Sequence, residues 1–200
     1  QPETTYEALN VSPWHDAGFK GQGKSIAVFD VEWFGATWPQ EELGDVQTHD
    51  CFAHRSCEIP FDPLHPRFAF EKGLHGFACA EIIRDLAPEA ELHLVRVNGQ
   101  TSLENAVAWA IREDIDIISM SLSFFNESFY DGTGSVSNLM DRLVEHDIVM
   151  VTSAGNYAQQ HYRSSFTDLD YDGFHDFEDP SGLRVYLKEG RRRINLLWDE

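Results

Sequence analysis

Residues 24–30, Lys-Ser-Ile-Ala-Val-Phe-Asp, decide the fold of this chain. Their length and β-branched content predict a buried strand, and the glycines within residues 21–23 mark its start. An acid at the carboxyl end of a buried parallel strand lies at the edge where open α/β sheets hold their functional sites. Asp30 is therefore a candidate site residue, although an Asp in this place can also simply cap a turn.

Strands and helices alternate along the rest of the chain, as the spacing of the apolar residues shows. Strands are predicted at 25–29, 91–97, 115–122 and 148–152, and helices at 78–86, 101–111 and 136–144. Such alternation indicates parallel strands joined by right-handed crossovers. The predicted fold class is therefore α/β, a doubly wound parallel sheet with helices on both faces. Residues 31–70 show no clear element and are expected to be irregular.

Composition places the chain among globular proteins. It has 200 residues, a hydrophobic fraction of 42% and a charged fraction of 24%, which suffices for a domain with a core. The net charge of -19 argues against a nucleic-acid partner, which needs a basic face. No apolar run is long enough to span a bilayer. No signal-peptide pattern is found at the start, so we expect any export signal or pro-segment to be removed or to lie outside this sequence.

Three polar residues are predicted to lie at one edge of the sheet. Asp30 ends the first strand, His75 begins the helix that leads to the second, and Asn156 follows the fourth. A buried carboxylate that accepts from Nδ1–H fixes the tautomer of an imidazole, and an amide can donate to a developing oxyanion. Acid, base and oxyanion donor are what acyl transfer by a serine requires. Taken singly, the histidine also suits an ordinary helix start and the asparagine an ordinary turn.

Four motifs resemble, in order, the successive motifs of the subtilisin-like serine proteases. They are Ile-Ala-Val-Phe-Asp at 26–30, His-Gly-Phe-Ala-Cys-Ala at 75–80, Ser-Met-Ser-Leu-Ser at 119–123 and Thr-Ser-Ala-Gly-Asn at 152–156. Subtilisins have the chain order Asp, His, Ser. The resemblance covers about residues 14–160. It implies a secreted or extracellular serine endopeptidase that acts on proteins or peptides and needs no cofactor for catalysis.

The resemblance also implies roles for individual residues. By it, Asp30 and His75 are two members of the catalytic triad, and Asn156 is the oxyanion-hole residue. The substrate-binding residues implied by it, which line the two walls of the primary specificity pocket, are Ser121, Leu122, Ser123, Ala154 and Gly155.

The sequence departs from the pattern of that family in several places. The family's nucleophile lies in a Gly-Thr-Ser pattern that opens a later helix, and no such pattern is found here. We therefore expect the nucleophile beyond Glu200 and expect this chain alone to be inactive. Phe77 and Glu81 stand where the family usually has Thr and Gly, and Val31–Glu32 replaces its small pair. Because such bulk can reshape a cleft, the alternative is an inactive protein of the same fold that binds peptides or partners.

The last part of the chain differs in character from the rest. Residues 157–182 are rich in Asp, Gly, Ser and aromatic side chains, and strands are predicted at 183–187 and 193–198. We expect residues 1–160 to form the N-terminal portion of the catalytic domain. Residues 161–200 resemble the start of an inserted β-rich domain, which interrupts some large subtilases before their serine.

Carboxylates in this last part have the spacing of a calcium loop. Those at positions 1, 3, 5 and 9 are Asp168, Asp170, Asp172 and Asp176, with Gly173 at position 6. The bidentate Glu expected at position 12 is replaced by Asp179, and no flanking helices are predicted. The hypothesis is a structural calcium site, and the alternative is a solvated acidic turn.

The cysteines permit two interpretations. Cys51 and Cys57 are close enough for a small-loop disulfide. Together with His49 and His54 they are also four candidate zinc ligands, at spacings unlike those of common zinc motifs. Cys79 falls on an apolar helix face and is expected to be a small core residue.

Overall fold

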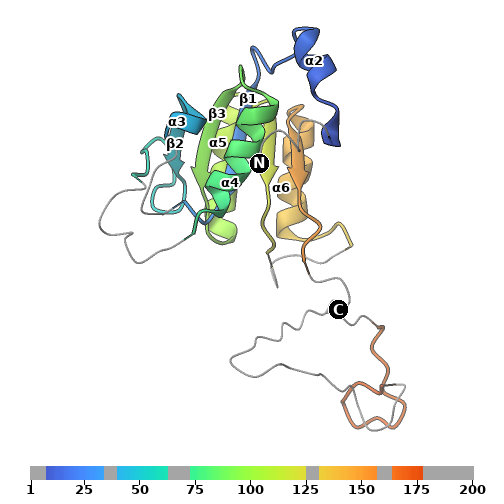
Figure 1. Ribbon diagram of the computed structural model, residues 1–200. Coiled ribbons are helices and arrows are strands. Elements are labelled where there is room, and N and C mark those ends of the chain that lie inside the picture. Colours follow the sequence, from blue (N-terminus) through green and yellow to red (C-terminus); the bar gives the residue numbers. More distant parts are fainter. Residues whose placement is uncertain (1–7, 34–39, 63–72, 125–130, 157–163, 178–200) are drawn as a thin grey trace.

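The computed structural model describes residues 8–33, 40–62, 73–124, 131–156 and 164–177 (Figure 1). Its centre is a five-stranded sheet in the order β2-β3-β1-β4-β5, in which every neighbouring pair is parallel. The strands are β1 (Ser25–Asp30), β2 (Gln47–Asp50), β3 (Glu91–Arg96), β4 (Ile117–Met120) and β5 (Val149–Thr152). The helices are α2 (Ser12–Asp16), α3 (Gln40–Leu43), α4 (His75–Leu86), α5 (Gln100–Arg112) and α6 (Ser135–Glu145). The predicted α/β class with a parallel sheet is confirmed.

Alternate residues of β1 belong to two separate cores on opposite faces of the sheet. Ala27 and Phe29 lie in the core that α5 and α6 cover. Ile26 and Val28 lie in the core that α4 covers. Because helices cover both faces, all of β1 after its first residue is buried, which explains its nearly continuous apolar sequence.

The prediction that residues 31–70 carry no regular element was wrong. Both α3 and β2 lie within this stretch, and β2 adds a strand beside β3. The sequence of β2, Gln-Thr-His-Asp, has no apolar residue and therefore does not show a strand pattern. Its polar groups find partners inside the protein: Thr48 Oγ1 donates to the Phe61 carbonyl at 3.0 Å, and Asp50 pairs with Arg96.

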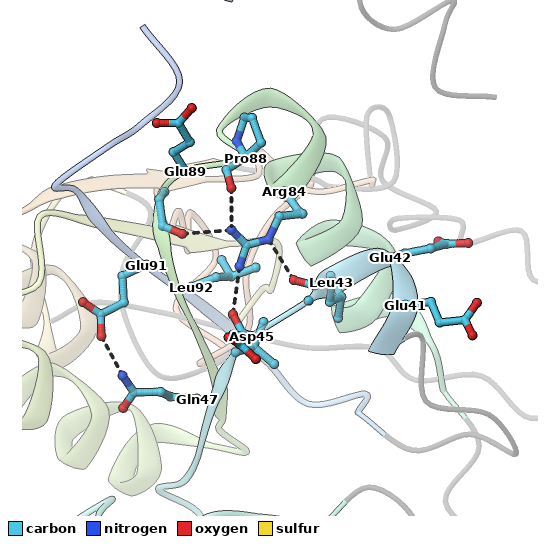
Figure 2. A pocket seen from close by; sticks show the side chains of 13 residues that line it. Glu41, Glu42, Leu43, Asp45, Gln47, Arg84, Pro88, Glu89, Glu91 and Leu92 are labelled. Carbon is cyan, nitrogen blue, oxygen red and sulfur yellow. Dashed lines mark hydrogen bonds between the residues drawn. The ribbon is translucent and has the colours of Figure 1, made fainter. Parts of the chain in front are cut away.

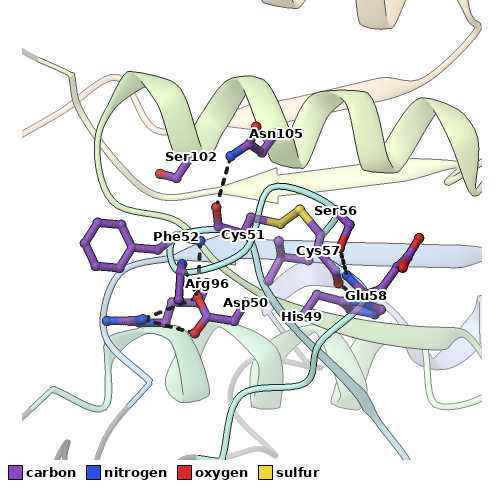
Figure 3. Close-up of a disulfide and its surroundings, with 12 residues drawn as sticks. His49, Asp50, Cys51, Phe52, Ser56, Cys57, Glu58, Arg96, Ser102 and Asn105 are labelled. Atoms are coloured by element: carbon purple, nitrogen blue, oxygen red, sulfur yellow. Dashed lines mark hydrogen bonds and ion pairs between the residues drawn. A yellow bond between two sulfur atoms is a disulfide. The ribbon is translucent and has the colours of Figure 1, made fainter.

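Cys51 and Cys57 form a disulfide that closes the loop after β2 (Figure 3). Both cysteines are fully buried. The side chain of Asn105 in α5 donates to the Cys51 carbonyl at 3.3 Å, which fixes the loop to the helix. Since zinc ligation needs thiolates, the disulfide excludes the four-ligand zinc site that His49 and His54 would have completed.

His49 instead forms a hydrogen-bonded pair with His93. Nδ1 of His49 lies 3.1 Å from the Cys57 carbonyl oxygen, and because a carbonyl only accepts, this nitrogen carries the proton. Nε2 of His49 therefore accepts from Nδ1–H of His93, at 3.1 Å. The ring of Trp109 packs on His49 with its centroid 4.3 Å away. A proton added to Nε2 of His49 would break the bond between the two imidazoles.

We expect this pair to make the fold sensitive to acid. Burial lowers the pKa of His49 from 6.5 to about 4, against the opposing charge of Glu113, and burial also lowers the pKa of His93, against Glu91 and Glu113. Between pH 6.5 and about 4 the unfolded chain binds a proton at His49 that the folded chain does not. The free energy of unfolding is therefore highest above pH 6.5 and falls as the pH falls toward 4.

Urea denaturation across this pH range tests that expectation. The variant His49→Gln should lose less stability than the wild type between pH 6.5 and 4. The variant His146→Gln, at an exposed position after α6, should follow the wild type. The same pH slope in His49→Gln and wild type would show that the pair does not titrate in this way.

The pocket in Figure 2 lies at the opposite edge of the sheet from Asp30, near the amino ends of β2 and β3. The guanidinium of Arg84 donates there to four backbone carbonyls, those of Leu43, Asp45, Pro88 and Ala90. Arg84 therefore joins α3 and α4 to the start of β3. Because these N–H donors are already used by backbone carbonyls, we do not propose this pocket as an anion-binding site.

Residues 164–177 contain neither helix nor strand. The strands predicted at 183–187 and 193–198 lie outside the described residues, so the division of the chain near residue 160 stays a prediction. Among the helices in the described ranges, none combines the length and the apolar character that crossing a membrane requires.

Candidate active site

Asp30 is fixed at the carboxyl end of β1 with its side chain fully buried. Oδ1 accepts hydrogen bonds from the N–H groups of Val31 at 2.8 Å and Glu32 at 2.9 Å. Burial raises the pKa of Asp30, while these bonds and His75 act in the opposite direction. The backbone thus occupies one carboxylate oxygen and leaves Oδ2 to face α4.

His75 is the first residue of α4, and it faces that oxygen. Nδ1 of His75 lies 2.7 Å from Oδ2 of Asp30, and because an ionised carboxylate only accepts, Nδ1–H is the donor. The histidine side chain is 45% exposed, whereas the acid is 0% exposed. The imidazole therefore connects a buried acid to the surface, and its Nε2 is left as the basic atom.

Gly76 allows α4 to approach β1 this closely. A Cβ at this position would lie 2.9 Å from both the Cβ of Asp30 and the ring of Trp33. The indole of Trp33 is fully buried, and its Nε1 donates to the carbonyls of Asp30 at 2.9 Å and Val95 at 3.3 Å. Trp33 therefore ties the ends of β1 and β3 together beside the acid.

Two of the bulky residues that suggested a blocked cleft, Phe77 and Glu81, make their contacts with other parts of the protein. Phe77 is 2% exposed, in the core beneath α4. Its ring packs edge-on against Trp33 with centroids 5.4 Å apart. Glu81 faces Glu42 of α3 and Asp85, and burial together with these acids raises its pKa. Phe77 thus fills the core, and Glu81 lies on the side of α4 toward α3.

Residues 121–123, predicted to bind substrate, follow β4 directly, and β4 is the neighbour of β1. Ser121 and Ser123 are exposed, whereas Leu122 is partly buried and packs against the core beneath α5 and α6. Burial raises the pKa of the Cys79 thiol, while the nearby Ser121 side chain acts in the opposite direction. Because Cys79 lies one turn after His75 on α4, residues 121–123 begin beside the histidine helix.

The remaining predicted site residues come after β5, and they are Ala154, Gly155 and Asn156. The N–H of Ser153 donates to the Met120 carbonyl at 3.3 Å, which joins this stretch to the end of β4. Asn156 is exposed. Among the described residues no hydrogen bond links it to Asp30 or His75. The structure thus brings acid and base into contact, and the asparagine follows β5 at the same edge of the sheet.

Two residues beside the acid and base were not predicted as part of the site. Trp33 escaped notice because most of its contacts, with Phe61, Phe77 and Val95, are to residues distant in the chain and leave no local pattern. Cys79 packs against the core beneath α4, as expected, but its Sγ also lies within 4.8 Å of the ligand atoms of Asp30 and His75. The spacing of four residues from His75 on a predicted helix is the signal that could have identified the cysteine.

Three of the four predicted calcium ligands lie together. Asp168, Asp170 and Asp176 each offer a carboxylate oxygen, and these atoms are all within 4.8 Å of one another. Asp172 is outside this group, and its Oδ1 accepts from the N–H of Phe174 at 2.8 Å. Asp168 also accepts from the backbone within the same loop, as acidic turns do without an ion. The arrangement is compatible with both interpretations.

Comparison with known proteins identifies the family. The model of the Subtilase family of peptidases matches residues 65–177, which is more than half of the 200 residues. The match contains His75 and Asn156, and Asp30 lies before it. No curated protein sequence matches the chain. The length of the family match, on a parallel α/β sheet of the expected kind, shows that this chain belongs to the subtilase family of serine proteases.

Proposed function

We propose that this chain supplies the acid and the base of a serine endopeptidase. In this proposal Asp30 orients the base, His75 is the base, and Asn156 donates to the oxyanion. The observation that carries the proposal is the 2.7 Å contact between Nδ1 of the exposed histidine and Oδ2 of a fully buried acid. Membership of a family of serine proteases supports the same reaction.

In the proposed reaction, His75 carries the proton from the nucleophile to the leaving group. Nε2 of His75 takes the proton of the serine hydroxyl as its oxygen attacks the scissile carbonyl, and the imidazolium later gives this proton to the leaving amine. Asp30 stabilises the imidazolium, because its Oδ2 accepts from Nδ1–H. The amide of Asn156 and a backbone N–H stabilise the oxyanion. The serine is expected beyond Glu200, since the chain carries no Gly-Thr-Ser pattern.

Protein or peptide substrates are proposed to bind in extended form along residues 121–123. An extended peptide gains main-chain hydrogen bonds when it lies beside an accessible strand-like segment. The exposure of Ser121 and Ser123 supports this placement. Ala154 and Gly155 are proposed to form the other wall of the specificity pocket.

We also propose that the protein is secreted or extracellular. The disulfide between Cys51 and Cys57 supports this, because disulfides persist in oxidising compartments and are rare in the cytosol. A protease that acts outside the cell also needs no nucleic-acid partner, in keeping with the net charge of -19.

Labelling with a fluorophosphonate tests the protease function. An activated serine attacks the phosphorus of the probe and displaces fluoride, so the protein extended beyond Glu200 should be labelled. The same extended protein with His75→Ala, and the 200-residue chain, should not be labelled. The control His146→Ala, an exposed histidine away from the acid, should be labelled like the wild type. A folded extended protein that resists labelling would favour the alternative, an inactive subtilase that binds peptides or partners.

We further propose a structural calcium site at Asp168, Asp170 and Asp176, with no role in catalysis. Calcium prefers several carboxylate oxygens, and three are grouped here. Calorimetric titration should show binding by the wild type, and Asp170→Asn should weaken it roughly tenfold or more, because one charged ligand is lost. Asp141→Asn, in α6, is the matched control. Equal heats for Asp170→Asn and wild type would leave only a solvated acidic turn.

A further inference from the structure

Cys79 is a free thiol placed beside the acid and base of the proposed active site. The chain has three cysteines, and the other two form the disulfide. Because Cys79 follows His75 by four residues in α4, both side chains lie on one face of the helix. The Sγ of Cys79, a ring nitrogen of His75 and a carboxylate oxygen of Asp30 all lie within 4.8 Å of one another.

These three groups form a ligand set of a recognisable kind. Thiolate, imidazole and carboxylate are the protein ligands of zinc, and three of them leave one tetrahedral position open. Ligand atoms around tetrahedral zinc stand about 3.5 Å apart, so small side-chain shifts would bring the three atoms to coordination distance. The buried acid gives the set a fixed anchor, and the exposure of the histidine, 45%, gives an ion a way in.

We propose that Asp30, His75 and Cys79 bind a divalent cation of the zinc class. The ion takes the place of the proton between Nδ1 of His75 and Oδ2 of Asp30, which lie 2.7 Å apart, and the imidazole then carries its proton on Nε2. The Cys79 thiol releases its proton to solvent, and its sulfur becomes the third ligand. A strongly acidic protein, with a net charge of -19, also attracts cations to its surface.

Binding at this place would regulate the proposed protease. With Nδ1 bound to the cation, the neutral imidazole carries its proton on Nε2 and has no lone pair there to take the proton of the serine, so the ion blocks the proposed proton transfer. The metal site itself does not depend on the protease function. Only its inhibitory consequence rests on that proposed function.

Cobalt is the probe for this site, because cobalt bound to a thiolate shows a sulfur-to-metal charge-transfer band in the near ultraviolet. Titration of the 200-residue chain with Co²⁺, without thiol reductants, should produce this band, and added Zn²⁺ should remove it. Cys79→Ser should abolish the band, and Asp30→Asn should weaken cobalt binding roughly tenfold or more. Asp170→Asn, which changes the distant acidic group, should leave the band unchanged.

Cobalt binding without the band would overturn the proposal, because Cys79 is the thiol that is free to give it. If Cys79→Ser does not fold, as judged by circular dichroism, the wild type alone decides. Zn²⁺ should then slow alkylation of Cys79 by iodoacetamide, and equal rates with and without zinc would overturn the proposal. A cobalt band in a protein that fluorophosphonate does not label would remove the protease function and leave the metal site in place.

Discussion

Replacing Arg96 with methionine is expected to lower the free energy of unfolding by about 3–5 kcal/mol, chiefly through its effect on Asp50. The two residues are register partners in β3 and β2. Nη1 of Arg96 lies 3.3 and 3.2 Å from the two carboxylate oxygens, and the side chains are 4% and 7% exposed. Without the guanidinium, the acid keeps the N–H groups of Phe52 and Ala53 but loses the positive charge that offsets its burial.

A second substitution distinguishes this cause from simple loss of packing. The double variant Asp50→Asn, Arg96→Met should recover much of the lost stability, because asparagine still accepts from the same N–H groups and carries no charge. Urea denaturation of the single and double variants gives the coupling. Lys20→Met is the control, since its contact with Glu89 is long and exposed and should contribute at most about 1 kcal/mol. Equal losses in Arg96→Met and Lys20→Met would contradict the prediction.

The elements with apolar periodicity could be predicted from the sequence, because the positions that face the core are apolar. In β1 and α5 the buried positions are nearly all apolar, so the type and approximate bounds of these elements follow from spacing alone. The edge of the sheet at which Asp30 and His75 meet follows from the same reasoning. The helix of His75 was expected to return from β1, whereas α4 follows β2, but both residues still lie at the carboxyl edge of the parallel sheet, where such sites occur.

The parts that escaped prediction are those held together by polar contacts across the sheet. β2 has no apolar residue, yet its Asp50 is buried because Arg96 of β3 lies opposite. The strand β3 looks half-exposed by its alternation, but both its faces are covered, and His93 is buried against His49 and Trp109. Each of these groups needs a partner that is more than forty positions away in the chain. No local pattern can therefore reveal them.

Gly76→Ala is expected to destabilise the protein by about 2 kcal/mol and to separate His75 from Asp30. Helix propensity alone predicts the opposite, a gain of about 1 kcal/mol. The added Cβ would lie 2.9 Å from the Cβ of Asp30 and from the indole of Trp33. Neither group can move away from the added methyl group. Asp30 lies in the sheet, and the indole is fully buried and hydrogen-bonded to two carbonyls. Overpacking of this kind costs up to about 3 kcal/mol, which exceeds the gain from helix propensity.

Urea denaturation and NMR of nitrogen-labelled histidine measure the two effects. The Nδ1–H proton of His75, held by Asp30 in the wild type, should be lost from the spectrum of Gly76→Ala. Ala78→Gly, at an exposed position of α4, should cost about 1 kcal/mol by propensity and keep the proton signal. A stabilised Gly76→Ala would mean that α4 stands further from β1, and that the glycine does not support the contact between acid and base.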